Sequence, residues 1–337
     1  MFRILLTHTD TARDLQFGTR AMAALSEHGE TVLNHGEVLT GQALIDAAQG
    51  CDLIVADRLT ALPAEVFRAA PDLLAVLRCA VDIRNIDVSA ASEAGVLVTR
   101  AIPSFAVSVA ELALGLMLDT ARGISRAAVA YAAGEPPQIM MGRQLRGETL
   151  GIVGYGAIGQ ELAAMARALG MQVLVTTPEP LAPQDGITPA PLEAMLAQAG
   201  FVACLASVTP ETTGMFGARA FAAMRRDAVF LNLARAELVG ERALAEALDA
   251  GEIAGAALDV GSATDQRPPL ALATRPDVTA TPHIGGQTPE AIEGQALHVA
   301  SQVAALAAGR LPPDAVNADE AARLRRWFDQ RSGAPGS

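Results

Sequence analysis

The 337-residue chain contains no lysine, so all 25 of its basic residues are arginine. Without lysine, no mechanism can use a lysine Schiff base or a lysine general base. Basic residues are also outnumbered, because 37 acidic residues give a formal net charge of −12 at pH 7. Nucleic acids and anionic membrane surfaces need a basic face, so we expect neither of them as a partner.

Cysteine and long apolar runs are scarce as well. The three cysteines, Cys51, Cys79 and Cys204, are odd in number and form no CxxC pair. They fit neither a disulfide framework nor a zinc site, so we interpret them as small buried residues and expect no metal. The sequence contains no run of 18 apolar residues, so we expect no membrane span, and the N-terminus lacks the layout of a signal peptide. We therefore expect a cytoplasmic protein.

The most informative segment that is present spans residues 150–159. An apolar, strand-like run ends there in the pattern Gly154-x-Gly156-x-x-Gly159, and a helix-like segment follows from Gln160. Between a strand and a helix, such glycines allow a tight turn, close backbone approach to a pyrophosphate and close helix–strand packing. The segment predicts a dinucleotide site at a helix N-terminus, and a glycine-rich turn without a ligand is the alternative.

Apolar strand-like runs alternate with helix-like segments along most of the chain. Alternation of this kind predicts parallel sheets that are covered by helices on both faces. The expected strands are residues 3–7, 31–33, 53–56, 74–78, 96–98, 151–153, 172–176, 201–205, 228–232, 255–259 and 278–280. A long apolar helix is expected at residues 103–122, with Pro103 at its start and Gly123 behind its end.

A length of 337 residues fits two domains, each with its own core. We expect an α/β protein with two doubly wound parallel-sheet domains, in which a Rossmann cofactor domain is inserted into a flavodoxin-like substrate domain. Residues 1–100 and 287–331 would form the substrate-binding (catalytic) domain. Residues 101–286 would form the NAD-binding Rossmann domain, and residues 332–337 a disordered tail.

Three motifs after the glycine loop make the prediction more specific: Leu231-Asn232-Leu233-Ala234-Arg235, Ala257-Leu258-Asp259-Val260 and Thr281-Pro282-His283-Ile284-Gly285-Gly286. Two more, Arg84-Asn85-Ile86-Asp87 and Ser108-Val109-Ala110-Glu111, lie upstream. In this order over residues 50–310, they make the chain resemble the D-isomer-specific 2-hydroxyacid dehydrogenases, the family of phosphoglycerate dehydrogenase and hydroxypyruvate reductase. The resemblance implies an oxidoreductase that moves a hydride between a nicotinamide cofactor and a small 2-oxo or 2-hydroxy acid.

The resemblance also implies roles for single residues. Arg235 would bind the substrate carboxylate with its planar guanidinium, and His283 would give a proton to the carbonyl oxygen or take it back. The alternative for Arg235 is a surface ion pair, and the alternative for His283 is a structural, hydrogen-bonded histidine. Asp259 would contact the nicotinamide end. The other implied cofactor contacts are Gly154, Gly156, Ala157, Ile158, Gly159, Thr177, Ala206, Ser207, Thr212, Leu233, Ala234, Gly285 and Gly286.

The sequence departs from the family's pattern at the partner of the catalytic histidine. The family's carboxylate lies five residues beyond the aspartate of Leu-Asp-Val, and Thr264 stands at that position here. We favour the carboxylate of the next residue, Asp265, as the partner of His283. The alternative is that Asp265 is a solvated loop residue paired with Arg267.

Three further departures concern the cofactor and the substrate. Thr177 replaces the ribose-binding acidic residue, yet residues 171–218 contain no arginine and Glu179 follows two residues later, so we expect NAD, with only a modest preference over NADP. The substrate loop, usually Gly-Val-Gly, reads Ala80-Val81-Asp82, and Phe105 occupies a position that is small or polar in many members. Formate dehydrogenase activity is disfavoured by Phe105 and Thr264.

These departures narrow the expected substrate and leave one other class of function open. Phe105 and Asp82 would restrict the pocket, and Asp82 would repel an anion unless Arg84 or Arg78 neutralises it. We therefore expect short unphosphorylated oxo acids such as glyoxylate or hydroxypyruvate. The resemblance to the family also implies a homodimer, with residues 124–146 as its arm. The alternative function is an NAD(H)-sensing binding protein of the corepressor type, without significant turnover.

Overall fold

The computed structural model of the chain describes residues 1–182 and 186–332. The chain folds into two compact units. Unit 1 comprises Met1–Ser104 and the part of the chain that begins at Pro289, and unit 2 comprises Phe105–Thr288. Of the tail expected at residues 332–337, Ser332 ends the last helix, and the other residues lie outside those described.

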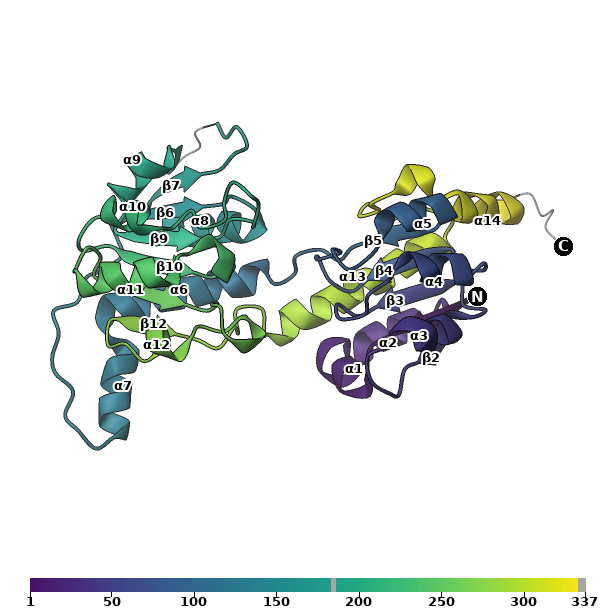
Figure 1. Cartoon of the computed structure of the whole chain (residues 1–337), viewed down its shortest axis with the longest axis horizontal. Helices are drawn as coiled ribbons and strands as arrows, with labels where there is room; N and C mark the ends of the chain where they lie inside the picture. The colour runs from purple at the N-terminus through teal and green to yellow at the C-terminus, as the bar shows by residue number, and fades with distance from the viewer. Residues whose placement is uncertain (183–185, 333–337) are drawn as a thin grey trace. The chain divides into compact units, whose positions relative to one another are not determined.

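Unit 1 is built on a five-stranded parallel sheet with the strand order β2-β1-β3-β4-β5 (Figure 1). Its strands are β1 (Phe2–Leu6), β2 (Gly29–Leu33), β3 (Leu53–Ala56), β4 (Ala75–Arg78) and β5 (Leu97–Thr99). Its helices are α1 (Asp10–Gln16), α2 (Gly18–Ser26), α3 (Gly41–Ala48), α4 (Ala64–Ala69), α5 (Val88–Ala94), α13 (Pro289–Ala307), the short η3 (Ala318–Glu320) and α14 (Ala322–Ser332). This is the flavodoxin-like order expected from the sequence.

The strands of unit 1 are apolar on both faces because helices cover both faces of the sheet. On β3 and β4, Val55 and Leu77 belong to the core cluster that includes residues of α2 and α13. Their neighbours Ile54 and Val76 belong to the opposite cluster, with residues of α3 and α4. Side chains alternate between the faces of a strand, so such a strand has a continuous apolar run rather than an alternating pattern.

Unit 2 contains a seven-stranded parallel sheet with the order β12-β11-β10-β9-β6-β7-β8. Its strands are β6 (Thr149–Val153), β7 (Gln172–Thr176), β8 (Ile187–Pro189), β9 (Phe201–Cys204), β10 (Val229–Asn232), β11 (Gly255–Leu258) and β12 (Val278–Ala280). Its helices are α6 (Ala106–Arg122), α7 (Ile124–Ala132), α8 (Ala157–Ala168), α9 (Leu192–Leu196), α10 (Ala218–Ala222), η1 (Ala236–Leu238), α11 (Glu241–Asp249), η2 (Thr264–Gln266) and α12 (Leu270–Ala273). Two doubly wound parallel sheets confirm the predicted fold class.

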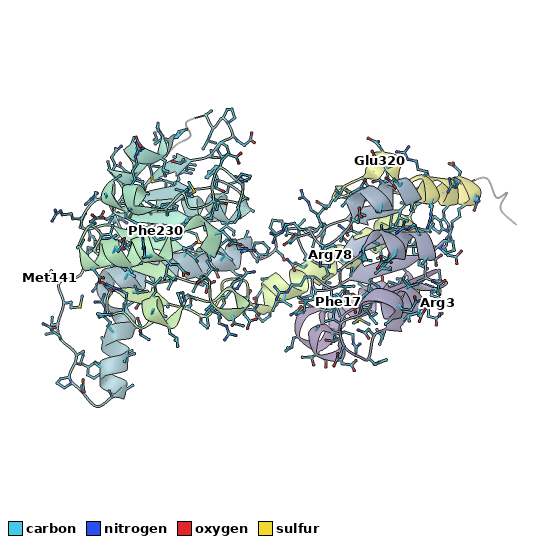
Figure 2. The ribbon with its side chains drawn as sticks, in the orientation of Figure 1. Arg3, Phe17, Arg78, Met141, Phe230 and Glu320 are labelled. Atoms are coloured by element: carbon cyan, nitrogen blue, oxygen red, sulfur yellow. The ribbon has the colours of Figure 1, made fainter. Side chains whose placement is uncertain are left out.

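Strand order reverses in unit 2 between β6 and β9, and open α/β sheets bind their ligands at the carboxyl ends of the strands near such a point. Phe230 of β10, the strand that pairs with β9 on the side away from β6, lies in the core of unit 2 (Figure 2). The apolar helix α6 packs against α8 and ends at Gly123, whose φ of 65° is the left-handed conformation of a helix C-cap. The glycine expected behind this helix is confirmed.

The structure also contains elements that we did not predict, including the edge strand β8 and the helix α7. β8 is only three residues long and ends in Pro189, which is tolerated at a sheet edge because it needs no ladder donor there. α7 has no buried residue, and Met141, beyond it in the chain, is fully exposed (Figure 2). Among the described residues, no helix has the length and apolarity that a membrane crossing requires.

Candidate active site

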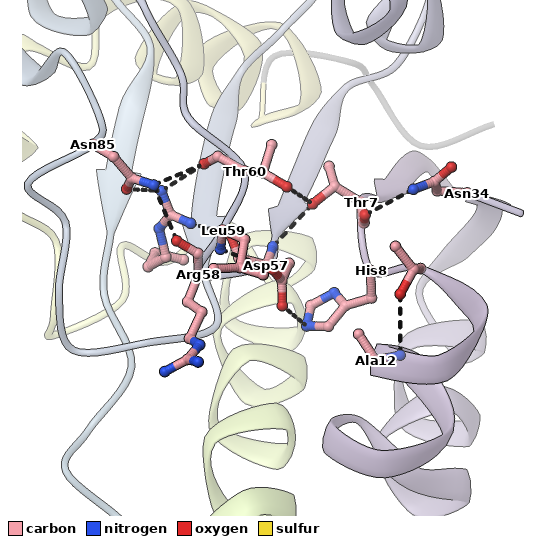
Figure 3. Close-up of polar contacts among 11 residues, drawn as sticks. Thr7, His8, Ala12, Asn34, Asp57, Arg58, Leu59, Thr60 and Asn85 are labelled. Carbon is pink, nitrogen blue, oxygen red and sulfur yellow. Dashed lines mark hydrogen bonds and ion pairs between the residues drawn. The ribbon is translucent and has the colours of Figure 1, made fainter. Parts of the chain in front are cut away.

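Buried polar residues gather at the carboxyl ends of β1, β3 and β4 in unit 1 (Figure 3). The Thr7 hydroxyl accepts a hydrogen bond from the Asp57 N–H at 2.9 Å and lies 2.8 Å from the Thr60 hydroxyl. His8 Nε2 lies 3.7 Å from the Asp57 carboxylate. Burial lowers the pKa of His8 to about 4, and the nearby Asp57 only partly opposes that shift. His8 is therefore neutral at physiological pH.

Arg78 is fully buried at the end of β4, and its guanidinium binds the neighbouring loops. It donates to the main-chain oxygens of Asp57 and Thr60 and, at 2.6 Å, to Asn85 Oδ1. Burial lowers the pKa of Arg78 to about 10, so it stays protonated. These bonds give Arg78 a structural role in fixing the loop that follows β4.

The loop expected to contact the substrate follows directly. Ala80 is buried, Val81 is half-buried and Asp82 is exposed. Arg84 binds the Asp82 carboxylate through Nε at 3.0 Å and through Nη2 at 2.7 Å. Because Arg84 neutralises Asp82, the expected repulsion of anions by Asp82 does not operate in this conformation.

In unit 2, the glycine loop joins β6 to α8, and the first and last of its three glycines have a steric explanation. Gly154 has a φ of 98°, and a Cβ on it would lie 2.7 Å from the backbone of Ala206. A Cβ on Gly159 would lie 2.4 Å from the carbonyl oxygen of Gly154. At Gly156, by contrast, a Cβ would meet no atom within 4 Å. Gly156 therefore faces open space at the start of α8.

This open space fits the pyrophosphate of a dinucleotide. Gly156 is the N-cap of α8 and makes no side-chain cap, and the first N–H groups of a helix, here including Ala157 and Ile158, have no acceptor within it. Backbone N–H groups at a helix N-terminus are a common anion site. Gly156, Ala157 and Ile158 would hold the phosphates there.

The other expected cofactor residues lie at or just beyond the same edge of the sheet. Thr177 follows β7 and is half-buried, and the Thr212 hydroxyl donates to the Ser207 carbonyl at 2.7 Å in the loop after β9. Those that follow β9, β10 and β12 are Ala206, Leu233, Ala234, Gly285 and Gly286. Their position beyond the carboxyl ends of the strands is where this fold binds nucleotides.

Arg235 is held on a fixed turn after β10. The buried Asn232 side chain accepts from the Ala234 N–H and donates to the Arg235 carbonyl, both at 3.1 Å. The Arg235 side chain is exposed, donates to the Ala234 carbonyl at 2.7 Å and forms no ion pair within residues 1–182 and 186–332. A fixed backbone with an unpaired guanidinium suits the binding of an anion. Asn232 belongs to the motif quoted for Arg235, but sequence reasoning assigned it no role.

Asp259 lies directly after β11 and is only 2% exposed. Its carboxylate accepts from the Thr281 hydroxyl at 2.7 Å and from the N–H groups of Ile284 and Gly285, both at 2.9 Å. Asp259 thus fixes the backbone on both sides of His283, a role that sequence reasoning did not foresee. Its contact with the nicotinamide stays a prediction.

The partner of His283 differs from our expectation. His283 Nδ1 lies 3.0 Å from the main-chain carbonyl oxygen of Asp265, whereas the Asp265 carboxylate is exposed and lies 3.6 Å from Arg267 Nη2. The loop backbone turns the Asp265 carbonyl toward the ring and the side chain outward. Thr264, at the family's carboxylate position, is exposed. The favoured interpretation of Asp265 is wrong in this structure, and the alternative pairing with Arg267 is the one observed.

A carbonyl oxygen only accepts hydrogen bonds, so the Nδ1 atom of His283 carries the hydrogen. This leaves Nε2 to exchange a proton with a ligand. His283 has a φ of 60°, which is uncommon for a residue other than glycine.

The three cysteines are buried, as predicted, and burial raises the pKa of Cys79 and of Cys204 to about 12.

Comparison with known proteins gives a consistent result. Residues 114–285 match the family model described as "D-isomer specific 2-hydroxyacid dehydrogenase, NAD binding domain". The chain is 34% identical over 304 residues to D-3-phosphoglycerate dehydrogenase of Methanocaldococcus jannaschii, an alignment that covers 88% of this chain and 57% of that protein. It is 33% identical over 307 residues to glyoxylate reductase of Korarchaeum cryptofilum, covering 88% of this chain and 92% of that protein.

A solved structure of a Thermus thermophilus protein resembles the chain with a TM-score of 0.79 at 32% identity, and the match covers 93% of this chain and 99% of that one. The chain spans about half the length of the phosphoglycerate dehydrogenases that it matches.

The lowered pKa of His8 predicts a pH dependence of stability in unit 1. Unfolding returns this pKa from about 4 to its ordinary value of 6.5, so the unfolded chain binds more protons between these pH values. The contribution of His8 is complete above pH 6.5 and is lost as the pH falls toward 4, by up to about 3 kcal/mol. Chemical unfolding followed by the fluorescence of Trp327, which stacks on Phe2 in unit 1, measures this loss.

The variant His8→Asn should lose this part of the pH dependence, whereas the half-buried His28→Asn should keep it. Equal slopes of unfolding free energy against pH in His8→Asn and the parent would contradict the prediction.

Proposed function

This chain belongs to the D-isomer-specific 2-hydroxyacid dehydrogenase family, and from that premise we propose that it is an NAD-dependent reductase of short unphosphorylated 2-oxo acids, acting on their 2-hydroxy acids in reverse. The observation that carries the proposal is in unit 2. There, an unpaired arginine and a histidine with a fixed tautomer follow β10 and β12, at the edge of the sheet that carries the glycine loop. Bound NAD(H) supplies the hydride chemistry.

The chain's own residues bind and orient the reactants and move the proton. Gly156, Ala157 and Ile158 at the start of α8 hold the cofactor's phosphates. Arg235 binds the substrate carboxylate and polarises the neighbouring carbonyl group through its planar donor fork. His283 gives a proton from Nε2 to the carbonyl oxygen during reduction and takes it back during oxidation.

Two observations support this function over the alternative of an NAD(H)-sensing binding protein. A sensor needs neither Arg235 nor His283, yet the structure holds both on turns fixed by buried side chains. The relatives in the comparison are named dehydrogenases and reductases. The cytoplasmic location expected from the sequence stays a prediction.

The proposed preference for unphosphorylated substrates rests on the arginines beside the loop of residues 80–82 in unit 1. Arg84 is bound to Asp82 through two nitrogen atoms, and Arg78 is fully buried and bound to protein oxygens. A phosphate at this loop would have to displace Asp82 from Arg84. A carboxylate at Arg235 would displace no carboxylate among the described residues, because Arg235 bonds there to the main-chain carbonyl of Ala234.

We propose that residues 124–146 form a homodimer contact. Within unit 2, Val129 and Tyr131 of α7 are about 70% exposed, Ile139 is 98% exposed and Met141 is fully exposed. Exposed apolar side chains concentrated on one segment are typical of protein interfaces. Sedimentation should give the mass of two chains. The double variant Val129→Glu, Tyr131→Glu should give one chain, and a parent that sediments as a monomer would disprove the contact.

A screen of small 2-oxo acids tests the function directly. With NADH, glyoxylate or hydroxypyruvate should be reduced with a higher kcat/KM than phosphohydroxypyruvate. Arg235→Gln should lower kcat/KM by about 100-fold, because a charge-assisted hydrogen bond to the carboxylate is lost. Arg242→Gln on the exposed face of α11 is the matched control and should match the parent. If no oxo acid is turned over, the proposed reductase activity is refuted. Efficient reduction of phosphohydroxypyruvate would refute only the proposed preference for unphosphorylated substrates.

The cofactor preference is a separate prediction. Thr177 carries no carboxylate for the ribose hydroxyls, but residues 171–218 offer no arginine to a 2′-phosphate. Arg167 lies beside Gly186, near the amino ends of β7 and β8. A 2′-phosphate would therefore lose hydration without gaining a cationic partner. We expect a lower KM for NADH than for NADPH, with a modest ratio. A lower KM for NADPH at equal kcat would contradict this.

A further inference from the structure

We propose that Glu241 is a positioning residue for His283, acting through the loop of residues 261–267 and the main-chain carbonyl of Asp265. The proposal rests on the proposed function for its kinetic consequences. Its structural part stands on the contacts of unit 2 alone. In this protein a chain of hydrogen bonds from Glu241 to His283 takes the place of the carboxylate that is missing at residue 264.

The first step is the contact that fixes the ring. The Asp265 carbonyl accepts from His283 Nδ1 at 3.0 Å. A main-chain oxygen has no flexible side chain that could follow the ring, so its position depends wholly on the loop backbone. The tautomer of His283 therefore depends on how well this loop is held.

The loop has an unusual backbone conformation. Asp265 and Gln266 have φ values of 59° and 57°, and together with His283 they are the positive-φ residues other than glycine in the described part of the chain. The left-handed conformation is unfavourable for a residue with a Cβ, and it persists where surrounding contacts enforce it. Bonds across the base of the loop, Gly261 N–H to Gln266 O at 2.9 Å and Ala263 N–H to Arg267 O at 3.0 Å, are part of this enforcement.

Glu241 supplies the anchor between this loop and the rest of unit 2. Its carboxylate accepts from the Ser262 N–H at 2.8 Å with one oxygen and from the Ser262 hydroxyl at 2.6 Å with the other. Both bonds are charge-assisted, and two bonds to one residue fix its orientation as well as its distance. Glu241 itself is the first residue of α11, whose Leu244 and Leu248 are buried in the core.

These contacts form a continuous path from a rigid helix to the proton-transfer group. The core fixes α11, Glu241 fixes Ser262, the closed loop fixes the Asp265 carbonyl, and the carbonyl fixes the ring of His283. The side chain of Asp265 lies outside this path, because its carboxylate pairs with Arg267 at 3.6 Å. The path requires a side chain at residue 241 that bonds to both the N–H and the hydroxyl of Ser262, and it does not involve the carboxylate of Asp265.

The kinetic test compares Glu241→Ala with Glu241→Gln. Removing the side chain should lower kcat for the reduced oxo acid by about 10- to 100-fold with little change in KM, since a misplaced proton donor slows the chemical step. The amide of Glu241→Gln can accept from the Ser262 N–H and donate to its hydroxyl, so this variant should retain most of the activity. Glu246→Ala on the exposed face of α11 is the matched control. Asp265→Asn should keep the parent's pH profile of kcat/KM.

A double-variant cycle separates positioning from general damage. In a His283→Asn background, Glu241→Ala should cause no further loss, because the group it positions is gone. The same loss in both backgrounds would overturn the proposal, as would parent-like kcat in Glu241→Ala. A shifted pH profile in Asp265→Asn would show instead that the carboxylate is the partner.

A readout without turnover keeps this test independent of the proposed function. In the ¹⁵N NMR spectrum of histidine-labelled protein, the His283 ring, assigned by its absence in His283→Asn, should be the Nδ1–H tautomer when neutral. Glu241→Ala should add the Nε2–H tautomer. Should Glu241→Ala not fold, Ser262→Ala removes only the hydroxyl bond and should give a smaller shift of the same kind. An unchanged tautomer overturns the proposal, whereas a changed tautomer in a protein without turnover refutes only the proposed function.

Discussion

The buried carboxylate of Asp259 is the interaction on which the candidate site depends most. It stands at the end of β11 and accepts three hydrogen bonds from the segment Thr281–Gly285 that follows β12. A buried carboxylate is costly unless donors surround it, and here the donors are the backbone and hydroxyl of the loop that it shapes. The left-handed conformation of His283 is therefore maintained by a charge whose hydrogen bonds all come from the segment around it.

Unit 1 also has a buried charged side chain that holds loops through hydrogen bonds, but its charge is positive. The buried guanidinium of Arg78, at the end of β4, donates to two main-chain oxygens and to Asn85. In each unit a charged residue at or just after the end of the strand next to the sheet edge organises nearby loops by bonding mainly to the backbone. Bonds to main-chain groups do not depend on the identity of the side chains that carry them, so they hold the segment Thr281–Gly285 and the loop of residues 57–60 through the backbone.

The fold class was predictable because both faces of each sheet are covered, which gives apolar runs that stand out in the sequence. The bounds of β3, β7 and β12 agree with the expected ones, whereas β8, with three residues and a proline, carries no such signal. In the site, motifs predicted which residues follow which strand. They did not predict that the carbonyl of Asp265 faces His283, because all residues share this group and only the φ values of Asp265 and Gln266 direct it.

A main-chain partner for the histidine changes what the sequence of the loop must provide. A carboxylate partner requires one acidic side chain, and replacing it with Thr264 would remove the interaction. A carbonyl partner instead requires a backbone that turns left-handed at residues 265 and 266 and an anchor that holds it there. Aspartate is among the residues that adopt this conformation more readily than most, and Gly261, where a Cβ would lie 2.6 Å from the Cα of Pro268, allows the loop to close tightly. The substitution at residue 264 is thus compatible with an oriented histidine, because the constraint has moved from the identity of one side chain to the conformation of the loop.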